Sequence, residues 1–101
     1  MKMLMIVARD FILDELENLL CDSGITGYTI LEEVAGKGKA GRVRKAIVYG
    51  ETNVVVFAVC SSAHVDKAVD ALKKFVTARA DALHGHPIPL KVFCHPCEEL
   101  I

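Results

Sequence analysis

Hydrophobic residues are concentrated in four short runs along the chain, at residues 2–8, 26–35, 53–60 and 90–94. The runs are rich in β-branched residues and bounded by charged residues, glycine or proline, which predicts four strands. Two of the intervening segments instead repeat their apolar residues with the spacing of a helix. These two stripes consist of Ile12, Leu16, Leu19 and Leu20, and of Val65, Ala68, Val69, Leu72 and Val76.

Capping residues set the expected limits of the two helices. Asp10 is the predicted N-cap of the first helix, and Gly24 is the residue expected to end it. Ser61 or Ser62 is expected to cap the second helix, and an irregular connection over residues 79–89 is expected to follow it.

The order of these elements is strand, helix, strand, loop, strand, helix, strand. It predicts one α+β domain over residues 1–101 with a ferredoxin-like, four-stranded antiparallel sheet. Two helices can cover only one face of such a sheet. The runs at 3–8 and 54–60 do not alternate with polar residues, so the second face is also apolar and needs a cover. We therefore expect an obligate homo-oligomer.

Composition excludes several classes of function. Twelve Lys and Arg against thirteen Asp and Glu give a net charge of −1, which does not favour nucleic acid as a partner. No apolar run approaches the roughly 20 residues of a membrane helix, and four cysteines fit a reduced chain, so a cytoplasmic protein is expected. Because neither a catalytic triad nor a pair of acid and base carboxylates stands out, we do not expect an enzyme.

Several motifs occur in a fixed order along the chain. They are Leu13-Asp-Glu-Leu16, Gly24-Ile-Thr-Gly-Tyr-Thr29, Gly36-Lys-Gly38, Val65-Asp66 with Val69-Asp70, and Lys91-Val-Phe93. In this order they resemble the PII nitrogen-regulatory signal proteins over residues 2–93. The resemblance implies a trimer that binds an adenine nucleotide (AMP, ADP or ATP) between subunits and regulates a transporter or enzyme through a long loop. It also assigns nucleotide contacts to Thr29, Gly36, Gly38 and Lys91.

The sequence departs from the family pattern at several places, and two of them bear on the expected phosphate contacts. The stretch from Thr29 to Gly36 is one residue longer, and the glycine-rich phosphate turn before the last strand reads Ile88-Pro-Leu-Lys91. Glycine lets backbone N–H groups approach a phosphate, whereas proline has no N–H to donate. These departures predict a divergent member with a smaller or altered effector, an adenine nucleotide or another small anion.

Residues 37–51 are expected to form a mobile loop or loose hairpin, with a short strand around residues 46–49. The loop is strongly basic, because it contains Lys37, Lys39, Arg42, Arg44 and Lys45 and no acid among them. Such a segment is typical of anion capture or of docking on an acidic or membrane-embedded partner. The alternative is a loop whose charges serve solubility alone.

The tetrapeptide Cys94-His-Pro-Cys97 opens the C-terminal tail, residues 95–101. Two thiolates at this spacing bind Zn²⁺ or another divalent metal, or form a redox pair. His84 and His86 complete a metal site only if a second subunit brings them close. The alternative function is therefore a metal-responsive or metal-tolerance trimer, and the third alternative is an inert tail.

Overall fold

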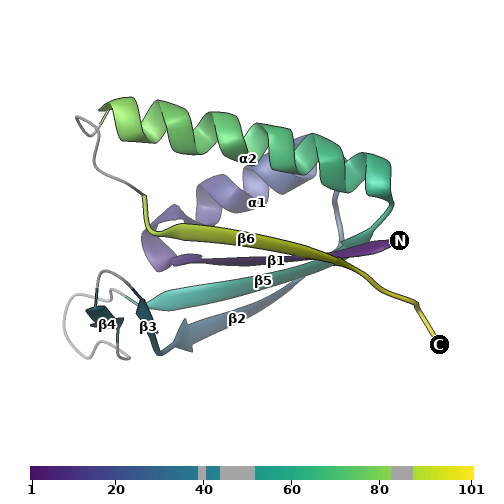
Figure 1. Ribbon diagram of the computed structural model, residues 1–101, viewed down its shortest axis with the longest axis horizontal. Coiled ribbons are helices and arrows are strands. Elements are labelled where there is room, and N and C mark those ends of the chain that lie inside the picture. The colour runs from purple at the N-terminus through teal and green to yellow at the C-terminus, as the bar shows by residue number, and fades with distance from the viewer. Residues whose placement is uncertain (39–40, 44–51, 83–87) are drawn as a thin grey trace.

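The computed structural model describes residues 1–38, 41–43, 52–82 and 88–101. Along the chain (Figure 1) the elements are β1 (Lys2–Arg9), the 3-10 turn η1 (Asp10–Ile12), α1 (Leu13–Asp22), β2 (Thr29–Val34), β3 (Gly36–Gly38), β4 (Gly41–Val43), β5 (Asn53–Cys60), α2 (Ser62–Ala82) and β6 (Leu90–Pro96). None of the helices in the described part of the chain is both long and apolar enough to cross a membrane.

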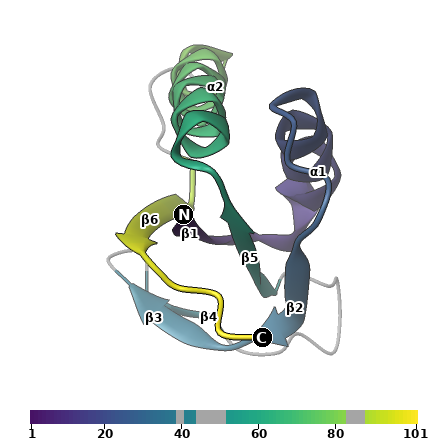
Figure 2. The ribbon, with the colours of Figure 1, turned by 90° about the vertical axis from the view of Figure 1, so that its right-hand side faces the viewer.

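Four strands form one sheet in the order β2-β5-β1-β6, and every neighbouring pair is antiparallel. Both helices lie on the same side of this sheet, as Figure 2 shows. This arrangement confirms the predicted ferredoxin-like α+β fold. The remaining strands, β3 and β4, pair only with each other and form a short separate ribbon.

The sheet has one covered and one open face. Residues with even numbers on the central strands point towards the helices and are almost completely buried; they are Leu4, Ile6, Ala8, Val54, Val56 and Ala58. Their odd-numbered neighbours face away from the helices. This open face is also apolar, because Val59 remains 45% exposed and Phe93 52% exposed. The open face is defined here by Met3, Met5, Val7, Leu31, Val55, Phe57, Val59 and Phe93, which lie in register with one another.

The start of α1 differs from the prediction. Asp10 does not cap the helix but begins the 3-10 turn, and α1 starts at Leu13. The carboxylate of Asp10 instead accepts a long hydrogen bond of 3.4 Å from the Thr52 hydroxyl, and its N–H donates to the carbonyl oxygen of Thr52 at 2.9 Å. Asp10 thus ties the end of β1 to the start of β5.

The predicted stop at Gly24 is confirmed. Gly24 has φ +87°, its N–H bonds to the Cys21 carbonyl at 3.0 Å, and the Ile25 N–H bonds to the Leu20 carbonyl at 2.9 Å. These two bonds form a Schellman motif, which requires the left-handed conformation that glycine adopts easily. A Cβ at Gly24 would also lie 3.1 Å from the ring of His64. Because the motif continues to Ile25, β2 begins at Thr29 and not at residue 26 as predicted.

The second helix begins as predicted and ends later. The Ser61 hydroxyl accepts a 3.3 Å hydrogen bond from the His64 N–H, so Ser61 is the cap. The helix continues to Ala82, through residues predicted to be irregular. Arg79 stabilises this last part, because it forms a salt bridge with Glu15 of α1 and lies 5.4 Å above the ring of Phe75.

A bulge interrupts the pairing of β2 with β5. Leu31 pairs with Val55 and Val34 pairs with Asn53, so β2 advances three residues while β5 advances two. Glu33, inside the bulge, has φ 57°, a conformation that is uncommon for residues other than glycine. The bulge lies immediately before the ribbon of β3 and β4, where the chain leaves the sheet.

Candidate functional site

Of the four residues expected to contact a nucleotide, three lie on β2 or on the ribbon that follows it, and the fourth lies on β6. Thr29 is exposed at the start of β2, and Gly36 and Gly38 are the ends of β3. A Cβ at Gly36 would lie 3.2 Å from the amide nitrogen of Asn53, so the close approach of β5 favours glycine there. Lys91, by contrast, is exposed on β6, at the other edge of the sheet.

The two places do not form one site within a single chain. β2 and β6 are separated by β5 and β1, which corresponds to three strand spacings, or about 14 Å. Lys91 lies in register with Val7, and Val7 with Val55, which pairs with Leu31 of β2. Thr29 and Lys91 thus occupy opposite edges of the same open face.

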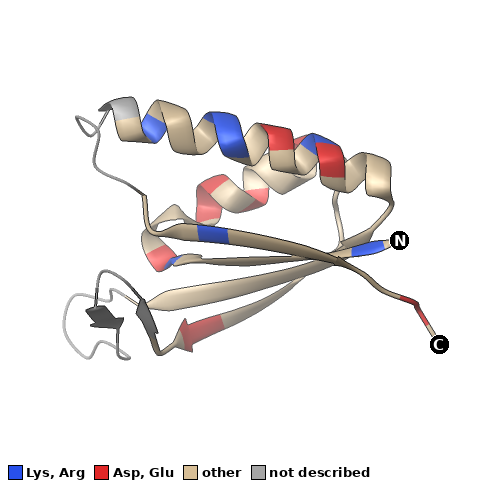
Figure 3. Ribbon diagram, viewed as in Figure 1, with Lys and Arg blue, Asp and Glu red and all other residues tan. Residues whose placement is uncertain are grey.

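The basic loop is described only in part. Lys37 and Arg42 are register partners in the ribbon of β3 and β4, which confirms a hairpin at the start of the segment. Lys39, Arg44 and Lys45, and the strand expected around residues 46–49, lie outside the described residues. Among the described elements, charged residues are concentrated on the helices while the strands of the sheet are mostly uncharged (Figure 3).

The C-terminal cysteines lie at the opposite end of the sheet from the ribbon (Figure 1). β6 continues two residues beyond the predicted end at Cys94, because β1 offers pairing partners as far as Lys2. The thiols of Cys94 and Cys97 are free. Within residues 1–38, 41–43, 52–82 and 88–101 no group of three Cys, His, Asp or Glu residues has the arrangement of a metal site. His84 and His86 lie outside that part of the chain.

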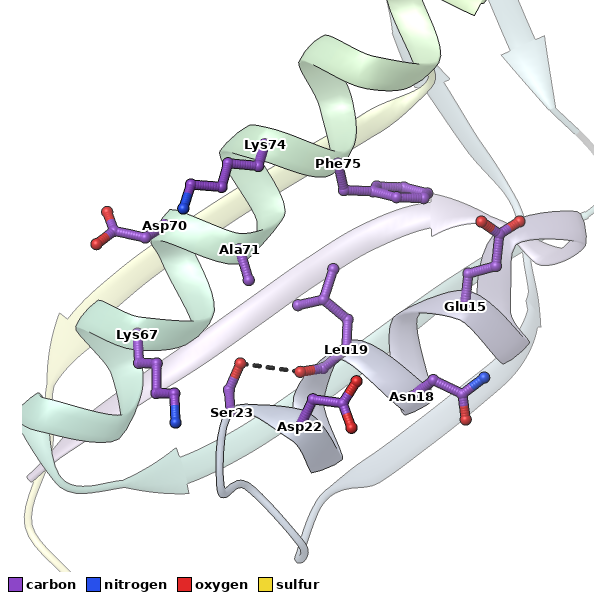
Figure 4. A pocket seen from close by; sticks show the side chains of 10 residues that line it. All are labelled: Glu15, Asn18, Leu19, Asp22, Ser23, Lys67, Asp70, Ala71, Lys74 and Phe75. Atoms are coloured by element: carbon purple, nitrogen blue, oxygen red, sulfur yellow. Dashed lines mark hydrogen bonds between the residues drawn. The ribbon is translucent and has the colours of Figure 1, made fainter.

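A groove between the two helices was not predicted. It has a volume of about 600 Å³ and is lined by Glu15, Asn18, Leu19, Asp22, Ser23, Lys67, Asp70, Ala71, Lys74 and Phe75 (Figure 4). No residue expected to bind nucleotide lies in it, and the sheet separates it from the open face.

Several polar groups of this groove already have partners in the chain. The Ser23 hydroxyl donates to the Leu19 carbonyl at 2.9 Å, and Glu15 pairs with Arg79. The remaining charges are of both signs and lie on exposed helix surfaces, which is typical of a solvated interhelical groove. Of the groove residues, the sequence predicted an interaction only for Asp70 and Lys74, whose i, i+4 spacing indicates a stabilising ion pair within one helix.

Comparison with known proteins supports the same fold. The chain is similar to the solved structure of CPII, a nitrogen regulatory PII-like protein from Thiomonas intermedia K12, bound to ADP, AMP and bicarbonate. The identity is 22%, the alignment covers 93% of this chain and 82% of that chain, and the TM-score is 0.76. The apo form of CPII aligns with 20% identity, 93% and 85% coverage and a TM-score of 0.67. No curated protein is similar enough to match the chain.

The family model for nitrogen regulatory protein P-II matches residues 1–101, the whole of the chain. This match agrees with the motifs between Leu13 and Gly38, with the sheet order and with the two helices on one face. The chain belongs to the nitrogen regulatory protein P-II family.

Proposed function

We propose that this protein is a cytoplasmic homotrimer that binds an adenine nucleotide between its subunits and regulates a transporter or an enzyme. The observation that carries the proposal is the open face of the sheet. It exposes apolar side chains on both edges, with Leu31 on β2 at 48% and Phe93 on β6 at 52%. Burial of this face against further copies of the chain removes that surface from water.

The same assembly explains why the expected ligand contacts are split. Thr29 and Gly36 lie at the β2 edge, while Lys91 lies at the β6 edge. When the β2 edge of one subunit lies beside the β6 edge of the next, three groups line one elongated cleft: the Thr29 hydroxyl at the start of β2, the Gly36 N–H beyond its end, and the Lys91 ammonium group. These groups suit a phosphate ester.

The effector is proposed from the chemistry of this cleft and from the CPII neighbour, whose structures contain ADP, AMP and bicarbonate. Proline at position 89 cannot donate a backbone N–H, and β2 carries Glu32 and Glu33 in its bulge. Both features disfavour a long polyphosphate chain because they remove a donor and add negative charge nearby. We therefore place AMP and ADP before ATP.

The regulatory step is assigned to the basic loop over residues 37–51, which begins at Gly36, the residue at the proposed cleft. Five Lys and Arg residues without an acid between Lys37 and Lys45 favour an acidic surface on the regulated protein. Binding in the cleft changes the loop's preferred conformation only to the extent that the nucleotide binds one loop conformation more tightly than another.

Titration calorimetry with AMP, ADP and ATP, each with and without bicarbonate, tests this function. We expect micromolar affinity for at least one nucleotide, and about a tenfold or larger loss on Lys91→Ala, because a charged hydrogen bond to phosphate contributes about 1.5–3 kcal/mol. Lys74→Ala is the matched control, since it removes the same charge from the interhelical groove. Absence of binding by every nucleotide, or equal effects of the two variants, would contradict the proposal.

A further inference from the structure

The last residues of β6 are held in an extended conformation along β1. Cys94 pairs with Leu4, His95 with Met3 and Pro96 with Lys2, and the Cys97 N–H then donates to the Met1 carbonyl at 3.3 Å. Three residues of extended chain separate the Cα atoms of Cys94 and Cys97 by about 10 Å. A disulfide needs Cα atoms about 4.4–6.8 Å apart, so these two thiols cannot bond while the segment stays paired.

The pairing is weakest at this point. Pro96 has no backbone N–H, so it donates nothing to the ladder, and β6 is an edge strand with a neighbour on one side only. Cys94, His95 and Pro96 are all exposed. The cost of separating this end of β6 from β1 is therefore small compared with opening the centre of the sheet.

A third cysteine lies close by but is unsuited to the same reaction. Cys60 is opposite Lys2 on the other side of β1, two strand spacings or about 10 Å from β6. Burial, followed by the charges of Cys94 and Cys97, raises the pKa of the Cys60 thiol. The raised pKa lowers the fraction of Cys60 thiolate at a given pH, and the thiolate is the nucleophile.

We propose that Cys94 and Cys97 form a reversible disulfide whose formation separates the end of β6 from β1 and repositions the C-terminal residues 98–101. The reduced, paired form is the one described above. In the oxidised form residues 94–97 close into a short loop that is incompatible with the three register pairs and the Cys97 to Met1 hydrogen bond. The two forms exclude each other, so the thiol state sets the conformation.

The reaction needs a disulfide oxidant of low molecular weight, such as oxidised glutathione. The thiolate of one cysteine attacks the oxidant and forms a mixed disulfide, which releases one glutathione thiolate. The second cysteine thiolate then displaces the other glutathione. Two protein thiols lose two electrons and two protons, and the oxidant takes up both to become two thiols.

The structural consequence is confined to one end of the molecule. Leu100 is 85% exposed and Ile101 is completely exposed, so the tail presents apolar side chains that move when β6 opens. The C-terminal tail lies at the end of the molecule opposite the ribbon of β3 and β4 (Figure 1). Thr29 pairs with Phe57, which is in register with Met5 and Phe93, so Thr29 lies at the same level of the sheet as the residue before Cys94. Gly36, by contrast, belongs to the ribbon and lies far from the switch.

Oxidation of the full chain with oxidised glutathione at neutral pH tests the inference. We expect the intact mass to fall by two hydrogen atoms, peptide mapping to place the bond between Cys94 and Cys97, and dithiothreitol to reverse it. Amide hydrogen exchange at residues 2–4 and at Cys94, His95 and Cys97 is expected to rise about tenfold or more on oxidation, while Ile6 and Val56 stay unchanged.

Cys94→Ser and Cys97→Ser are each expected to abolish both changes, whereas Cys21→Ser and Cys60→Ser are the matched controls that retain them. A stable glutathione adduct without an internal bond, a bond to Cys60, or a Cys94–Cys97 bond that leaves the exchange unchanged would each overturn the proposal. All four variants replace one cysteine by serine. Loss of the disulfide in the Cys94 and Cys97 variants alone therefore reports on these two thiols and not on a general effect of the substitution on folding.

Discussion

The two faces of the sheet are built from alternate residues of the same strands but are in different environments. On the covered face, Ile6 and Val56 are 0% and 1% exposed beneath the helices. On the open face, their neighbours Met5 and Phe57 are only partly buried, and Phe93 beside them is half exposed. Both faces are apolar, so hydrophobicity alone does not say which one a chain can cover by itself. The difference teaches that the helices cover only one of the two apolar faces, and the proposed assembly predicts a second stage of stabilisation between chains.

The largest expected effect comes from comparing Ile6→Ala with Met5→Ala, two neighbours on opposite faces of β1. Ile6→Ala leaves a cavity under the helices and should lower the free energy of unfolding by about 2–5 kcal/mol, whatever the protein concentration. Met5→Ala should cost less in dilute solution and more as the concentration rises, because its surface is buried only on assembly.

Urea unfolding of each variant at two protein concentrations measures this comparison. The wild-type midpoint should itself rise with concentration. A Met5→Ala cost that is the same at both concentrations would show that no second copy covers the open face.

A smaller effect is expected from charging the open face with Phe93→Glu. Burial of a Phe side chain contributes about 1.5–3 kcal/mol, so replacing it by a carboxylate at each contact should shift the assembly towards single 11.0 kDa chains. Phe11→Glu is the matched control, because Phe11 is 63% exposed in η1 and lies outside the sheet. Light scattering after gel filtration measures the mass. Equal masses for the two variants, or a wild type that is already a single chain, would remove the basis of the proposed cleft.

The sequence predicted the order of elements because hydrophobic period and glycine placement act locally. Gly24 ends its helix by backbone geometry, and that requirement is visible in the residue type. Asp10 shows the limit of such reasoning. Its carboxylate had two partners available, a helix start and the distant Thr52, and only the tertiary structure decides between them.

The candidate site was harder to predict than the fold. The motifs place Thr29, Gly36 and Lys91 in the family pattern, but they do not show that the edges of the sheet hold them apart. The bulge at Glu33 was not visible in the sequence, because it depends on how β2 pairs with the distant strand β5. The interhelical groove had no signal, because its lining residues come from two helices and are ordinary surface residues.

The smallest expected effect concerns pH and the edge of the covered face, where Cys60 packs against the core. Burial raises the pKa of this thiol above its ordinary value of 9.0, with further contributions from Cys94 and Cys97. The unfolded chain therefore loses the proton at lower pH than the folded chain. Below pH 9 both states hold it and the stabilisation is complete, while above pH 9 only the unfolded state ionises and the free energy of unfolding falls.

Urea unfolding under reducing conditions, at a series of pH values from 8 to above 9, measures this fall in the free energy of unfolding. Cys60→Ser should reduce the slope relative to the wild type. Tyr28, whose pKa is also raised, by burial first and then by Glu17 and Cys21, contributes equally to these two proteins, so their difference reports on Cys60. A thiol on the open face would be buried only on assembly. If the slope of the free energy of unfolding against pH changed with protein concentration, Cys60 would therefore be buried between chains and not beneath the helices.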